Sequence, residues 1–86
     1  MWDMNDGAEQ DNHTDGQEFL LQLGQRIKEL RRARHLSQEQ LAEATDLVQH
    51  YISQIEQGER NVSVVTLRLI ALALGVTLSA LVEGLS

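Results

Sequence analysis

Residues 36–58 constrain the fold more than any other part of the chain, because their pattern contains two short helices separated by a tight turn. Ser37 is a preferred N-cap residue, and Gln40 three positions later completes a capping box, so a helix is predicted to run to about residue 44. A second helix is predicted over about residues 47–57, and the glycine after it suits the left-handed conformation of a C-terminal cap. Two short helices arranged in this way can lay the second one in the major groove of DNA.

Three further helical patterns flank this segment. The first is predicted from a capping box at Asp15 to about Arg34, with apolar residues on one face at positions 20, 23, 27 and 30. Ser63 caps another helix that ends at Gly75, and Thr77 caps a short last helix. No segment alternates between apolar and polar residues over a useful length, so the sequence predicts an all-α fold of five helices.

The acidic charge is concentrated at the N-terminus. The net charge is −6, and residues 1–18 hold six acidic residues and no lysine or arginine. Residues 1–14 are polar and almost free of aliphatic side chains, so we predict a disordered tail there and a domain over residues 15–86. The rest of the chain is neutral, and five of its seven basic residues fall within residues 26–34.

The composition excludes several classes of function. The chain has no cysteine, and its three histidines are scattered, so neither a disulfide nor a metal site is expected. No phosphate-binding loop, dinucleotide fingerprint or nucleophile motif is present, so we expect no cofactor and no enzyme. No apolar run is long enough to span a membrane, and no signal segment is present, so a cytoplasmic, nucleoid-associated location is expected.

The outer face of the predicted helix at residues 47–57 carries no negative charge. With Ile52 and Ile55 turned inward, the residues that face outward are His50, Ser53, Gln54 and Gln57, with Gln49 in the first turn. Glutamine can form a bidentate pair with adenine, and histidine or serine can donate or accept a hydrogen bond. From this helix alone, a DNA-reading face and an ordinary solvated face remain equally good interpretations.

The wider pattern favours the first interpretation. Four motifs follow one another: Leu23-Gly24-x-Arg26-Ile27-x-x-Leu30-Arg31, Leu36-Ser37-Gln38-x-x-Leu41-Ala42, Tyr51-Ile52-Ser53-x-Ile55-Glu56-x-Gly58-x-Arg60-Asn61 and Leu67-x-x-Ile70-Ala71-x-Ala73-Leu74-Gly75-Val76. On these motifs, residues 20–83 resemble the Cro/phage-repressor-like (XRE-like) helix-turn-helix family. The resemblance implies a five-helix phage-repressor-like fold and sequence-specific binding of double-stranded DNA.

The resemblance also implies roles for individual residues. Base contacts are expected from Gln49, His50, Ser53 and Gln54. Phosphate contacts are expected from Gln38, Gln57, Arg60 and Asn61. Arg31 and Glu56 would form an ion pair inside the domain, and both lie beside apolar stripes, where a buried charge needs a partner. Two separate solvated charges are the simpler alternative for this pair.

The chain departs from the family where the two helices of residues 36–58 meet. Asp46 stands where the family usually has glycine, and Val48 stands where a small polar N-cap is usual. Asp46 either takes the left-handed conformation itself or caps the second helix, with Gln49 closing a capping box.

A small regulator of transcription is therefore expected, acting as a repressor or controller on a pseudo-palindromic operator. A homodimer is favoured, and part of the C-terminal apolar set Leu78, Leu81, Val82 and Leu85 is a candidate for its contact. The alternative is a protein-interaction module, antitoxin-like or an adaptor, whose ligand is another polypeptide. The acidic tail is expected to be a solubilising arm, or else to recruit a protein partner through Trp2 and Met4.

Overall fold

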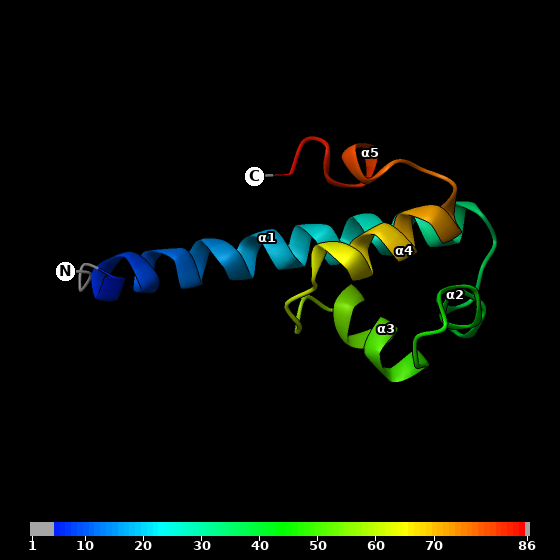
Figure 1. The fold of residues 1–86 in the computed structure, drawn as a ribbon, viewed down its shortest axis with the longest axis horizontal. Coiled ribbons are helices and arrows are strands. Elements are labelled where there is room, and N and C mark those ends of the chain that lie inside the picture. Colours follow the sequence, from blue (N-terminus) through cyan, green and yellow to red (C-terminus); the bar gives the residue numbers. More distant parts are fainter. Residues whose placement is uncertain (1–4, 86) are drawn as a thin grey trace.

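Five α-helices and no strand make up the part of the chain that the structure describes, which confirms the predicted all-α class. This computed structural model describes the backbone of residues 5–85 and the side chains of residues 16–85. The helices are α1 (Asn5–Ala33), α2 (Gln38–Thr45), α3 (Gln49–Glu56), α4 (Val64–Leu74) and α5 (Leu78–Val82). In Figure 1, α2 and α3 lie together on one side of the long α1, and α5 lies on the other.

The predicted start of the first helix near Asp15 is wrong, because α1 begins at Asn5 and passes through the expected capping box. Helix nucleation is the unfavourable step, and the half of α1 that packs in the core is already helical. Each residue added toward the N-terminus then gains a backbone hydrogen bond, and no proline interrupts the helix. The N-terminal part of α1 extends past the other helices in Figure 1. The separate tail at residues 1–14 stays a prediction, and its Trp2 and Met4 lie outside the described residues.

One apolar core joins all five helices. The α3 helix packs on α1 and α2, and α5 packs on α1 and α4. The side chains that are almost fully excluded from solvent are Leu23, Ile27, Leu41, Ile52, Ile55, Ile70, Leu74 and Leu81. The C-terminal apolar set helps to close this core, since Leu81 is buried and its three partners are half-buried against the core.

Gly24 allows α3 to approach α1 closely. A Cβ atom at this position would lie 2.5 Å from the backbone oxygens of both Ile55 and Glu56. Real Cβ atoms do not approach an oxygen so closely, so only glycine fits between these two backbones. This close contact sets the distance between α1 and the C-terminal end of α3.

The turn between α2 and α3 settles the two alternatives for Asp46. Asp46 has a φ of 61° and a ψ of 29°, so it adopts the left-handed conformation and ends α2. Val48 is the N-cap of α3 and makes no capping hydrogen bond with its side chain. The predicted capping box of Asp46 and Gln49 is therefore wrong, because a left-handed C-cap residue of α2 cannot also be the extended N-cap of α3.

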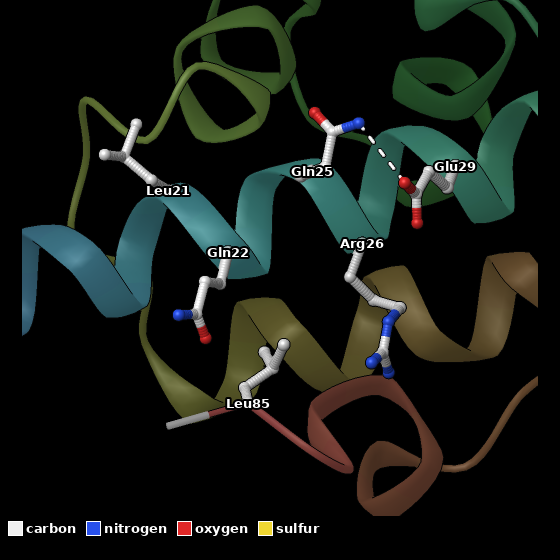
Figure 2. A pocket seen from close by; sticks show the side chains of 6 residues that line it. All are labelled: Leu21, Gln22, Gln25, Arg26, Glu29 and Leu85. Carbon is white, nitrogen blue, oxygen red and sulfur yellow. Dashed lines mark hydrogen bonds between the residues drawn. The ribbon is translucent and has the colours of Figure 1, made fainter.

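Arg26, one of the five basic residues at positions 26–34, binds the C-terminal segment. Its Nη1 donates to the carbonyl of Ala80 at 3.1 Å, and its Nη2 donates to that of Glu83 at 2.8 Å. Figure 2 shows the side chain reaching from α1 toward α5, at the edge of a hollow of about 400 Å³. The guanidinium thus satisfies carbonyls at the end of α5, where no further helical turn can do so.

Candidate nucleic-acid interface

The α3 helix turns its apolar side inward and its amides outward. Ile52, Ile55 and Glu56 are buried. Of the residues expected to face outward, Gln49, His50 and Gln57 are exposed, whereas Ser53 and Gln54 are half-buried. This is the arrangement that leaves a helix face free to enter a groove while the opposite face holds it to the domain.

Arg31 and Glu56 make the predicted ion pair, and it is buried. Arg31 Nε donates to Glu56 Oε2 at 2.7 Å, and Arg31 Nη2 donates to Oε1 at 3.0 Å. The side chains are only 9% and 2% exposed. The remaining arm of the guanidinium donates to the carbonyl of Leu36 at 2.8 Å. The pair therefore ties α1, the turn before α2 and the end of α3 together with charge-assisted hydrogen bonds.

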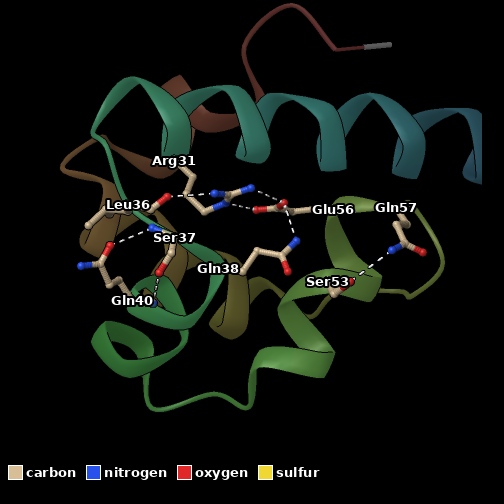
Figure 3. A network of polar contacts seen from close by, with 8 residues as sticks. All are labelled: Arg31, Leu36, Ser37, Gln38, Gln40, Ser53, Glu56 and Gln57. Atoms are coloured by element: carbon tan, nitrogen blue, oxygen red, sulfur yellow. Dashed lines mark hydrogen bonds and ion pairs between the residues drawn. The ribbon is translucent and has the colours of Figure 1, made fainter.

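Gln38 extends this network toward the surface. Its Nε2 donates to Glu56 Oε1 at 3.0 Å, so the carboxylate binds side chains from both α1 and α2 (Figure 3). A carboxylate only accepts hydrogen bonds, which fixes the side of the amide that faces it. Ser37 and Gln40 form the predicted capping box at the same end of α2. Gln38 thus braces α3 directly, and its expected contact with phosphate stays a prediction.

Arg60 lies back against α3, an arrangement that the sequence pattern does not predict. Its Nη1 donates to Gln54 Oε1 at 2.8 Å, and its guanidinium carbon lies 4.9 Å from the centre of the Tyr51 ring. No helical spacing relates residues 54 and 60, because the chain turns between them. The left-handed Gly58 and a backbone bond from Glu59 to Gln54 make that turn.

A hollow lies beside this cluster, at the end of α3 that follows the turn. Its volume is about 420 Å³, and its walls are residues 46–48 together with His50, Tyr51, Gln54 and Arg60. Asp46 contributes a carboxylate to it, whereas the outer face of α3 has no acidic residue.

The remaining predicted site residues lie toward the C-terminal end of α3. Gln57 Nε2 donates to Ser53 Oγ at 3.1 Å, and Asn61 is exposed beyond the end of α3.

Comparison with known proteins identifies the family. Residues 27–81 match the family model described as helix-turn-helix. The chain belongs to the helix-turn-helix family. It is 47% identical over 65 residues to the control protein C.MunI of Mycoplasma sp, with 74% of this chain and 88% of that protein covered. It is also 47% identical over 60 residues to the immunity repressor of Bacillus phage phi105, with 70% of this chain covered but only 42% of the repressor.

A solved structure supports the same assignment. The restriction-modification controller protein C.AhdI from Aeromonas hydrophila matches with a TM-score of 0.71 and 44% identity, over 72% of this chain and 94% of that one. This helix-turn-helix protein is a DNA-binding regulator of transcription. Within residues 5–85, no helix is both long and apolar enough to cross a bilayer.

Proposed function

We propose that this helix-turn-helix protein is a repressor or controller that reads a pseudo-palindromic operator as a homodimer. The observation that carries the proposal is the outer face of α3, where Gln49 and His50 are exposed and Gln54 is half-buried beside them, while the buried pair of Arg31 and Glu56 holds the helix. Glutamine and histidine side chains on such a face can bond the base edges in the major groove. Regulation by occupancy, without catalysis, at the nucleoid in the cytoplasm is part of this proposal.

Phosphate contacts are assigned to residues that follow the C-terminal end of α3 and to the first residue of α2. These residues are Gln38, Gln57, Arg60 and Asn61. Backbone contacts of this kind fix the position of a protein on the duplex but carry no sequence information. Arg26 and Arg31 bind within the domain, which removes two of the five basic residues at positions 26–34 from this role.

Selection of bound sequences from random duplex DNA tests the reading role. We expect the wild-type protein to enrich a two-fold motif, and Gln54→Ala to relax one position in each half-site. Loss of one good base contact costs about 1–3 kcal/mol of discrimination. Gln25→Ala removes an exposed glutamine of α1 and is the matched control, with the wild-type motif retained.

Failure to enrich any sequence at low salt would refute the proposal. A tight complex with a co-expressed protein, together with no salt-sensitive DNA binding, would instead favour a module whose ligand is a polypeptide. The acidic N-terminal segment is the part of the chain that we would then expect to bind such a protein partner.

An exposed apolar stripe on α4 is the surface that we expect a second copy to cover. Val65, Leu69 and Leu72 follow one side of the helix, and Val64 lies beside them; these side chains are 37–70% exposed. Contiguous exposed apolar groups are typical of interaction surfaces, and one recognition helix buries too little surface for tight operator binding. A two-fold contact would use the same stripe on both copies and place two α3 helices about 34 Å apart.

Leu72→Glu is expected to weaken self-association by at least about tenfold, because the two-fold contact loses the burial of two leucines. Sedimentation velocity over a range of protein concentrations measures this change, and operator binding should weaken with it. Leu21→Glu is the control, since Leu21 on α1 is 56% exposed and Leu72 is 61% exposed. If Leu72→Glu stays dimeric, the interface is elsewhere.

A further inference from the structure

Arg60 has a geometry that a phosphate contact alone does not require. A residue that only neutralises phosphate would extend into solvent, but the Arg60 guanidinium lies over the Tyr51 ring and donates to Gln54. Arginine stacks on aromatic rings through its planar, weakly hydrated guanidinium, so Tyr51 holds the guanidinium in place. The Arg60 guanidinium that contacts Gln54 is therefore held in place by Tyr51, another residue of α3.

This contact fixes the orientation of the Gln54 amide. A guanidinium has only donors, so the atom of Gln54 that faces it must be the acceptor Oε1. The hydrogen bond is charge-assisted and 2.8 Å long, which makes it stronger than a bond between neutral groups. Among the described residues, no group binds Nε2 of Gln54, so the two N–H donors of the amide are the free part.

Orientation decides which base a glutamine reads. A bidentate pair with adenine needs Oε1 and Nε2 directed at the same base edge, because adenine offers one donor and one acceptor there. With Oε1 already bonded to Arg60, the N–H donors of Nε2 are the groups that Gln54 has left for a base edge. Guanine offers two acceptors to such donors, N7 and O6, and thymine offers O4, whereas adenine pairs its single acceptor N7 with a donor that then lacks its partner.

We propose that Arg60 is a positioning residue for base recognition, and that Tyr51, Arg60 and Gln54 act as one unit that reads an acceptor edge in place of adenine. This inference rests on the proposed function of α3 as the DNA-reading helix. It gives Arg60 a part in sequence discrimination, beyond the contribution of its charge to affinity. The guanidinium keeps further donors for a phosphate, so both roles are compatible.

The test is selection from random duplex DNA with the full chain as wild type, Arg60→Met, Gln54→Ala and the double variant. Arg60→Met keeps a long side chain over Tyr51 but donates no hydrogen bond. At the position that Gln54→Ala relaxes, we expect Arg60→Met to raise the frequency of adenine relative to guanine and thymine by about fivefold or more, the low end of discrimination by one bidentate contact. In the Gln54→Ala background, Arg60→Met should change no base preference.

Arg60→Lys separates positioning from charge. Lysine keeps the charge for phosphate but lacks the planar fork that stacks on Tyr51, so it should shift base preference as Arg60→Met does. A residue that only contacts phosphate would behave otherwise: its loss would weaken all sequences alike and lower the salt slope by about one.

The outcomes are distinguishable. An unchanged base distribution in Arg60→Met, with wild-type selection intact, overturns the role of Arg60 and leaves the proposed function standing. A change of preference that persists without Gln54 also overturns it, because Arg60 would then act on the DNA by itself. No selected motif with the wild-type protein removes both proposals. Arg60 is exposed, and thermal melts of each variant establish that the compared proteins are equally folded.

Discussion

Glu56→Ala is expected to lower the free energy of unfolding by about 3–5 kcal/mol, the cost of removing one partner from a buried ion pair. The Arg31 guanidinium would keep its place in the interior with only the carbonyl of Leu36 as acceptor, and Gln38 would lose its bond as well. Small domains have only about 5–15 kcal/mol of stability in total, so the loss is a large fraction. Urea denaturation followed by circular dichroism measures it.

Glu59→Ala is the control for this prediction, because Glu59 is exposed and only three residues away. Its stability should stay within about 0.5 kcal/mol of wild type. Replacing both Arg31 and Glu56 by apolar residues should recover part of the loss, since no charge is then left buried without a partner. Unchanged stability of Glu56→Ala together with lost sequence discrimination would contradict the structural role and point to a direct role in reading DNA.

Gly24→Ala is the second substitution with a large expected effect. The new methyl group would lie 2.5 Å from two backbone oxygens at the end of α3, and a backbone cannot turn away as a flexible side chain can. Overpacking a core typically costs about 1–3 kcal/mol, and a clash with backbone falls at the upper end of that range. The end of α3 must move away from α1, so operator affinity is expected to fall along with the melting temperature.

Gly16→Ala is a matched control for this second prediction, because it makes the same change in the same helix. Among the described residues, and apart from its chain neighbours and the backbone of its own helix, nothing lies within 4 Å of a Cβ placed at Gly16. Alanine in a helix interior is favoured over glycine by about 0.5–1 kcal/mol, so this variant should be slightly more stable than wild type. Equal effects of the two substitutions would show that helix propensity, and not the contact with α3, determines the result at Gly24.

Local signals in the sequence predicted much of the fold. Ser37, Ser63 and Thr77 each cap the helix that was expected to follow them, and all three accept a hydrogen bond from the backbone. These caps depend only on neighbouring residues, which is why they can be read from a pattern. The sequence pattern predicts that α3 begins near residue 47, two residues before its start at Gln49, because the pattern is compatible with both conformations of Asp46.

Features that depend on the packing of distant segments could not be read in this way. The motif contains Gly24, but the contact with the end of α3 that requires glycine exists only after α1 and α3 have packed. Arg26 belongs to the basic stretch of residues 26–34, and only the position of α5 shows that its guanidinium binds carbonyls within the domain. The contact between Arg60 and Gln54 depends on the path of the loop after α3, which the residue types alone do not specify.

The buried side of α3 holds the helix to the domain, whereas its outer side faces solvent, so the two sides can change separately during evolution. Ile52, Ile55 and Glu56 face the domain, so substitutions at the outward positions leave the scaffold unchanged. After gene duplication, one copy of the regulator can therefore change the operator that it recognises without a compensating substitution in the core. Gln54 is less independent, because its hydrogen bond to Arg60 means that a change at either residue alters the contacts that the other can make.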